Sequence, residues 1–91
     1  EYGTSPIAAE AQYWIGESYY SQREYVRASA EFAEVAEKYP AGDKVPASML
    51  KRAYALISLS KRVEAKALLE KLIKQYPNTN EAELAKARLK E

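Results

Sequence analysis

Residues 9 to 40 read AEAQYWIGESYYSQREYVRASAEFAEVAEKYP, and the pattern of their second half returns 37 residues later. The dipeptide Tyr39-Pro40 recurs as Tyr76-Pro77, and the apolar residues before it recur at matching positions. The matched pairs are Ala28 and Ala65, Phe32 and Leu69, Val35 and Leu72, and Tyr39 and Tyr76. A fixed period of about 20 to 50 residues is typical of a stack of repeated structural units. The sequence therefore predicts a repeat protein, with Tyr2-Gly3 as the remnant of a preceding unit.

The apolar residues of each unit predict helices. Ala28, Phe32, Val35 and Tyr39 follow one another at three- and four-residue spacing, which places them on one face of a helix. The segments SQR and SKR are short, so the helices that they join must run antiparallel as neighbours. We expect helices over residues 6–21, 24–39, 45–60 and 63–76, followed by a short last helix. The predicted fold is all-α: a solenoid of two helical hairpins and a C-terminal capping helix.

Several residues indicate where the helices begin and how closely they pack. Ser5 is placed to cap the first helix, with Pro6 in its first turn. Asn78, followed three positions later by Glu81, has the pattern of a capping box for the last helix. Gly16 lies in mid-helix, where glycine costs about 1 kcal/mol relative to alanine, so another helix should approach closely there.

The repeat period divides the chain, read as a single domain over residues 1–91, into units. The expected divisions are a remnant over 1–4, repeat one over 5–40, repeat two over 44–77 and the capping helix over 78–91.

Composition argues against most enzyme and metal chemistry. The chain has no Cys and no His, which removes thiol nucleophiles, the commonest metal ligands and the usual near-neutral general base. We therefore expect no cofactor. Basic residues are scattered and lack a recognition motif, which argues against nucleic-acid binding. No apolar run approaches the roughly 20 residues of a membrane span, so no membrane insertion is expected, and no signal peptide is visible at Glu1.

The first unit resembles the tetratricopeptide repeat, whose signature residues have counterparts at Ile15, Gly16, Tyr19, Ala28, Phe32 and Pro40. The second unit keeps the pattern less fully, because Arg52 replaces the first apolar residue of the signature. The longer period arises in the loop AGDKVPA between the units. This resemblance implies a protein-binding module whose concave groove is lined by the first helix of each pair.

A narrower resemblance concerns the segments YWIGESYY, the paired YP helix ends and the closing YPNTNEAELAKARL. They are similar to the C-terminal repeat domain of the CpoB/YbgF family, the Tol-Pal-associated cell-division coordinators. That resemblance implies a periplasmic domain that binds a TolA-like partner. A second resemblance is to the repeat scaffold of BamD, an outer-membrane protein assembly lipoprotein whose helices also often end in YP.

A helical wheel separates the residues of the first helix into two sets, each with at least one tyrosine. Ala11, Ile15, Ser18 and Tyr19 are predicted to face neighbouring helices. The expected partner-binding groove comprises Tyr13, Glu17 and Tyr20, with their counterparts Leu50, Tyr54 and Ile57. Such a surface suits protein binding, since tyrosine buries a large area while offering a hydroxyl. Alternatively, these rings fill the interior of a tight superhelix or are merely half-exposed.

Trp14 falls between these two sets. It should point to where a preceding repeat would stack, so we expect it to be partly exposed and to offer an edge for self-association.

Three kinds of function remain open at this stage. The first is a non-catalytic protein-protein interaction module, and the second is an architectural element that has no binding groove. The third is an enzyme that uses the carboxylates Glu17 and Glu10 for acid-base chemistry, a role that acids on helix surfaces seldom have. We favour the first.

Overall fold

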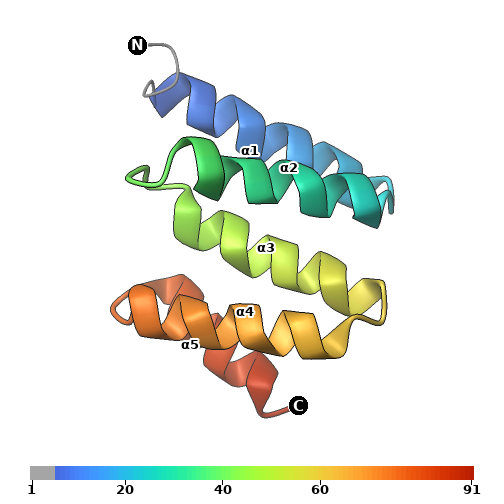
Figure 1. Cartoon of the computed structure of the whole chain (residues 1–91), viewed down its shortest axis with the longest axis vertical. Helices are drawn as coiled ribbons and strands as arrows, with labels where there is room; N and C mark the ends of the chain where they lie inside the picture. Colours follow the sequence, from blue (N-terminus) through green and yellow to red (C-terminus); the bar gives the residue numbers. More distant parts are fainter. Residues whose placement is uncertain (1–5) are drawn as a thin grey trace.

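The computed structural model describes residues 6–91, which form helices joined by short loops (Figure 1). The five helices of this range are α1 (Pro6–Ser21), α2 (Tyr25–Lys38), α3 (Val45–Ser58), α4 (Arg62–Gln75) and α5 (Asn80–Leu89). Consecutive helices pack against each other, and no strand occurs among the described residues. The predicted all-α arrangement of helical hairpins is therefore confirmed. The expected cap Ser5 and the remnant Tyr2-Gly3 lie outside the described residues.

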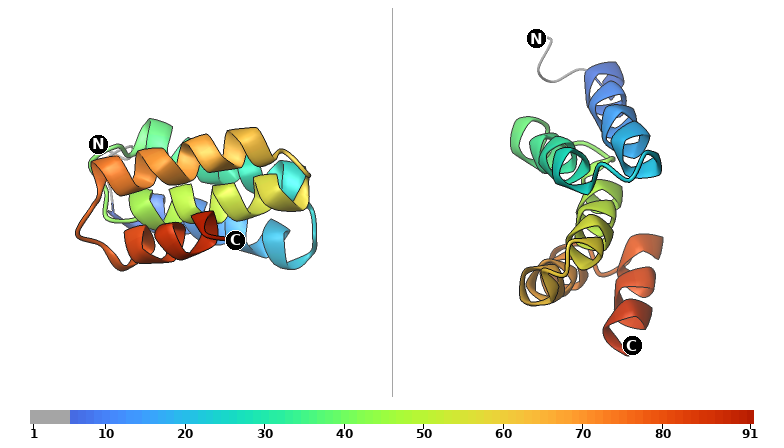
Figure 2. Two further views of the ribbon diagram at one scale, coloured as in Figure 1. Left: turned by 90° about the horizontal axis from the view of Figure 1, so that it is seen from below. Right: turned by 90° about the vertical axis from the view of Figure 1, so that its right-hand side faces the viewer.

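The helices form two layers, seen most clearly when the molecule is viewed along their axes (Figure 2). Helices α1, α3 and α5 lie toward one side, and α2 and α4 lie toward the other. Helix α3 occupies the middle of the stack, where it packs against α2, α4 and α5. Each side of the molecule is thus built from alternate helices, as a solenoid of helical hairpins requires.

The core consists of two apolar clusters, one for each hairpin. In the first hairpin Phe32 and Val35 pack with Tyr13 and Ala28 between α1 and α2. The second cluster joins α3, α4 and α5 and comprises Val45, Met49, Leu50, Ala53, Leu69, Leu72 and Ala85. The residues matched by the 37-residue period, Phe32 with Leu69 and Val35 with Leu72, therefore occupy equivalent core positions.

Gly16 lies directly against Phe32. A Cβ atom added at Gly16 would come within 2.6 Å of Cε1 of the Phe32 ring. Real carbon atoms pack at about 3.5–4.0 Å, so no side chain fits there unless the ring moves. This is the close helix approach that the mid-helix glycine predicts.

The same contact fixes the rotation of α1, and it corrects the predicted helical wheel. Gly16 and Tyr13 face α2, whereas Ala11, Ile15 and Ser18 are exposed, with 46% of the Ile15 residue accessible to solvent. The prediction that these three residues face neighbouring helices is wrong.

Both hairpin turns adopt one backbone conformation. Arg23 and Ser60, which are equivalent in the two units, have φ angles of 65° and 64°. The following amides, of Glu24 and Lys61, donate to the carbonyls five residues earlier at 2.9 and 2.8 Å. This hydrogen bond ends a helix in the Schellman motif, which usually has glycine in the left-handed position.

The last helix begins at a different residue from the one predicted. Thr79 is its N-cap, and its Oγ1 accepts a hydrogen bond from the amide of Ala82 at 3.1 Å. The prediction of Asn78 as the cap, with Glu81 completing a capping box, is therefore wrong by one residue. Thr79 also donates from Oγ1 to the Tyr76 carbonyl at 2.7 Å, which ties α5 to the end of α4.

Candidate partner-binding surface

The residues predicted to form a groove come from α1 and α3, which lie on the same side of the molecule as α5 (Figure 2). The structure separates these residues by burial. Glu17, Tyr20, Tyr54 and Ile57 are half-buried and contribute to the surface. Tyr13 and Leu50 are buried, with 7% and 4% of their surfaces accessible.

Tyr13 and Leu50 are thus core residues, which corrects the expectation that both line an open groove. Rotation of α1 toward α2 places the Tyr13 ring 5.7 Å from that of Phe32. Leu50 belongs to the cluster between α3, α4 and α5. These two side chains instead fill the interior of the helical stack, which was the alternative to an open groove.

Glu17 connects α1 to α3. Its Oε2 accepts a hydrogen bond from the Tyr13 hydroxyl at 2.9 Å, and its Oε1 lies 3.4 Å from Nζ of Lys51. Lys51 also lies over the Tyr20 ring, 5.5 Å from its centre. Because both carboxylate oxygens are engaged, Glu17 acts here as a bridge between helices that also orders the neighbouring tyrosines.

A second lysine stabilises the other end of α1. Nζ of Lys44 lies 4.9 Å from the centre of the Tyr13 ring and 5.7 Å from that of Trp14. The same nitrogen is 4.0 Å from Oε2 of Glu10. A cation over an aromatic ring is attracted by the electrons of the ring face. Lys44 therefore joins the start of α3 to three side chains of α1.

Trp14 is 54% exposed, as expected, and its ring meets that of Tyr13 edge to face at 5.2 Å.

Tyr54 and Ile57 lie where α3 meets α5. The Arg88 guanidinium is 4.6 Å from the centre of the Tyr54 ring. Ile57 lines a hollow of about 300 Å³ together with residues of α4 and α5. The remaining lining residues are Arg62, Ala65, Lys66, Leu69, Arg88, Leu89 and Glu91. The hollow has an apolar floor and a mostly basic rim.

Two tyrosines of α1, Tyr13 in the core and Tyr20 at the surface, have raised pKa values. Burial, and secondly the hydrogen bond to Glu17, raise the pKa of the Tyr13 hydroxyl well above its ordinary value. Burial and the neighbouring Tyr25 raise the pKa of Tyr20, whereas Arg88 acts in the opposite direction. At neutral pH both hydroxyls are uncharged, and that of Tyr13 is engaged as a donor to Glu17.

The basic residues of this side were missed in the prediction. Lys44 and Lys51 are seven residues apart, which places them on one helical face, and both lie opposite acids of α1. For Lys51 the signal is the charge distribution, since residues 1–45 carry most of the acids and residues 46–91 most of the bases; Lys44 lies in the acidic half, so this signal does not point to it. Arg88 could not have been placed over Tyr54 without knowing how α5 packs.

The described residues contain no group of three or more acidic side chains arranged to hold a metal ion. None of the helices in residues 6–91 has the length and apolar character needed to cross a bilayer.

Comparison with known proteins identifies the family. A search of curated proteins gave no significant match. The family model described as YfiO, outer membrane lipoprotein, matches residues 6–86, which is nearly the whole chain. The match supports a tetratricopeptide-type domain and agrees with the second of the two narrower resemblances, that to the assembly lipoprotein. The chain belongs to the YfiO family of outer membrane lipoproteins.

Proposed function

We propose that this chain is a non-catalytic protein-protein interaction module of the bacterial cell envelope. It would bind a segment of a partner protein on the side formed by α1, α3 and α5. The observation that carries this proposal is the row formed by Tyr20, Tyr54 and Ile57, half-buried residues of α1 and α3 that end at the basic-rimmed hollow. Rigid aromatic side chains beside a hollow are typical anchors of protein interfaces.

The family, described as outer membrane lipoprotein, supports a place at the outer membrane. The resemblance to the repeat scaffold of BamD adds support for a periplasmic partner in outer-membrane protein assembly. A TolA-like partner of the Tol-Pal cell-division system is the second candidate. Its support is the likeness of the segment YWIGESYY to the CpoB/YbgF family. In the structure Tyr20 of this segment contributes to the surface, whereas Tyr13 packs inside.

The proposal is tested by titrating the purified chain with two partners in a calorimeter. One is the C-terminal domain of TolA, and the other is the periplasmic region of the outer-membrane assembly machinery. We expect saturable binding of one of them. Tyr54→Ala and Ile57→Ala should each weaken it at least about tenfold, the effect of removing an interface anchor worth more than about 1.4 kcal/mol.

Val63→Ala is the matched control, because Val63 is apolar and 84% exposed but lies on α4, away from this row. Circular dichroism should show unchanged helicity in all variants. Binding that survives both substitutions would move the site to another face. No saturable binding of either partner would favour the purely architectural role.

We further propose that Trp14 provides an edge for self-association, because its large exposed ring lies beside the exposed Ile15. Sedimentation equilibrium should then show a concentration-dependent mass that Trp14→Ser abolishes. A monomer at every concentration would contradict this.

A further inference from the structure

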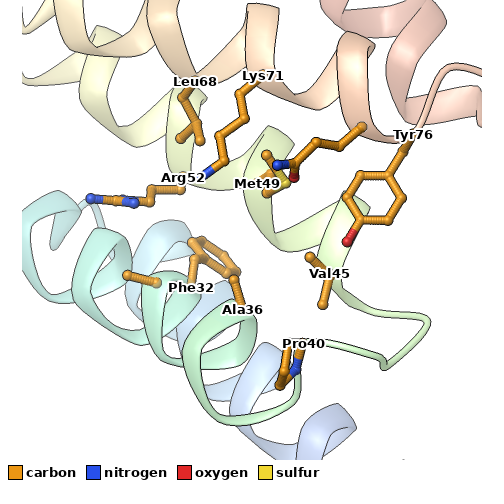
Figure 3. A pocket seen from close by; sticks show the side chains of 11 residues that line it. Phe32, Ala36, Pro40, Val45, Met49, Arg52, Leu68, Lys71 and Tyr76 are labelled. Carbon is orange, nitrogen blue, oxygen red and sulfur yellow. The ribbon is translucent and has the colours of Figure 1, made fainter.

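Helices α2 and α4 lie on the opposite side of the molecule (Figure 2). There, residues of α2, α3 and α4 line a groove, part of which Figure 3 shows. Two hollows of about 190 and 420 Å³ lie along it. Arg52, Leu68 and Lys71 line both hollows, so the two are continuous. None of the residues that line this groove belongs to the hollow beside Ile57. The groove is therefore a separate surface.

The walls of the first hollow are largely apolar. Phe32 and Ala36 of α2, Met49 of α3 and Leu68 of α4 all face it (Figure 3). Because these side chains come from three helices that pack on one another, the hollow has a fixed shape rather than depending on one flexible loop.

Two cations, Arg52 and Lys71, line both hollows, and neither has a counter-ion among residues 6–91. Figure 3 shows Lys71 extending from α4 toward Arg52 on α3. The Nε atom of Arg52 is buried and has no hydrogen-bond partner among residues 6–91. Every ion pair in that part of the chain involves other residues. A buried donor without an acceptor is unfavourable.

Arg52 is also the residue that departs from the repeat pattern. Its equivalent in the first unit is Ile15, an apolar side chain. The second unit therefore has an arginine where the first has an apolar side chain. The guanidinium carries five N–H hydrogen-bond donors, and the one on Nε is unpaired at the groove. An incoming carboxylate would provide the acceptor that the guanidinium lacks.

We propose that this groove binds a short segment of a protein partner in which an acidic residue is flanked by apolar ones. The carboxylate pairs with Arg52 and Lys71, because a guanidinium offers parallel donors that match a carboxylate. The flanking apolar side chain enters the hollow beside Phe32 and Met49. Glu64 lines the far end of the groove and repels a second acid there, so the bound segment has its negative charge near Arg52.

The test uses the capped peptide GLLELFG, with one acid between leucines, and its neutral counterpart GLLQLFG, each titrated into the ¹⁵N-labelled chain and followed by NMR. The acidic peptide should shift amides of α2, α3 and α4 saturably and bind at least about tenfold more tightly than the neutral one, the effect of one charge-assisted hydrogen-bonded pair. Arg52→Gln and Lys71→Gln should each remove most of that difference. Increasing salt should weaken the acidic peptide selectively.

Lys74→Gln is the matched control, because Lys74 is an exposed cation of α4 that does not line the groove. It should leave the preference for the acidic peptide unchanged. Tyr54→Ala should also leave it unchanged, which separates this proposal from the one for the α1, α3 and α5 side. Equal binding of the two peptides, no saturable shift, or shifts confined to α1 and α5 would each overturn the proposal.

Discussion

The substitution Gly16→Ala tests whether the first hairpin depends on the close approach of α1 and α2. The added Cβ would lie 2.6 and 2.7 Å from two carbons of the Phe32 ring. Phe32 is only 1% exposed, and its core neighbours Tyr13, Ala28 and Val35 limit how far the ring can turn. Overpacking of a core costs about 1–3 kcal/mol of stability, and a clash this severe should cost about 3 kcal/mol. Alanine regains about 1 kcal/mol of helix propensity. The expected net loss of stability is therefore about 2 kcal/mol.

The second repeat shows how the clash should be relieved. Ala53 and Leu69 occupy the positions equivalent to Gly16 and Phe32, and both are buried in the core. The double variant Gly16→Ala/Phe32→Leu rebuilds that pair in the first repeat. Phe32→Leu alone should cost about 1 kcal/mol, because it leaves space unfilled. In the double variant the methyl group enters that space, so stability should return to within about 1 kcal/mol of the unmodified chain.

The assay is urea unfolding followed by far-ultraviolet circular dichroism, with all four chains compared at one temperature. The two single losses add up to about 3 kcal/mol, whereas the double variant should lose at most about 1, a coupling energy of about 2 kcal/mol. Additive losses would refute the direct contact between Gly16 and Phe32. So would a Gly16→Ala variant that is more stable than the unmodified chain, since helix propensity alone would then decide the outcome.

Three further predictions concern the helix ends and the buried tyrosine. Arg23→Gly and Ser60→Gly should each stabilise the chain by about 1 kcal/mol in urea unfolding, because glycine adopts their positive φ without strain; a loss of stability would contradict this. Thr79→Ala should cost about 1 kcal/mol in thermal unfolding, whereas Asn78→Ala should cost little, and the reverse order would restore Asn78 as the cap. The pKa of Tyr13 is higher in the folded state than in the unfolded state, where it is about 10. The protonated hydroxyl therefore contributes its full share of stability below pH 10, and this share is lost as the pH rises from there toward the folded-state pKa. The unfolding free energy should therefore fall less steeply above pH 10 in Tyr13→Phe than in the unmodified chain, and equal slopes would contradict that.

The fold could be predicted from the sequence because its determinants are periodic. The spacing of Phe32, Val35 and Tyr39 and its repetition 37 residues later define both the helical faces and the order of stacking. Each helix found was expected, and the differences in their ends amount to one or two residues. The cap of α5 was misplaced because Asn78 and Thr79 are both good N-cap residues, and only the backbone shows which one precedes the first helical turn.

The site was less predictable, because it depends on the rotation of α1 about its own axis. Two rotations looked possible from the sequence, since Ile15 and Tyr13 are both large and apolar enough for a core. The ring of Phe32 decides between them, because it can approach α1 only where Gly16 lacks a side chain. That contact turns Tyr13 inward and Ile15 outward. The mid-helix glycine thus predicts the close approach, whereas the inward turn of Tyr13 depends on where the Phe32 ring lies.

The fold also shows where the unevenly distributed charges lie, with most acids in residues 1–45 and most bases in residues 46–91. Two acids of α1 pair with lysines of the α3 region: Glu10 with Lys44, just before α3, and Glu17 with Lys51, within it. Of these pairs, only that of Glu17 with Lys51 joins the acidic first half of the chain to the basic second half. The surplus of positive charge remains farther along the chain. On one side of the molecule, positively charged side chains lie on the rim of the hollow beside Ile57. On the other side, Arg52 and Lys71 line the groove.

Both proposed surfaces therefore favour an acidic segment of a partner, although they differ in geometry. A partner could engage the two sides in succession only by wrapping around the edge of the stack. Two short segments joined by a flexible linker would instead occupy both at once, and the second contact would gain from the first through its raised local concentration. If so, Arg52→Gln should weaken a full-length partner far more than it weakens an isolated segment that binds beside Tyr54. If the two losses are equal, the two surfaces do not serve the same partner.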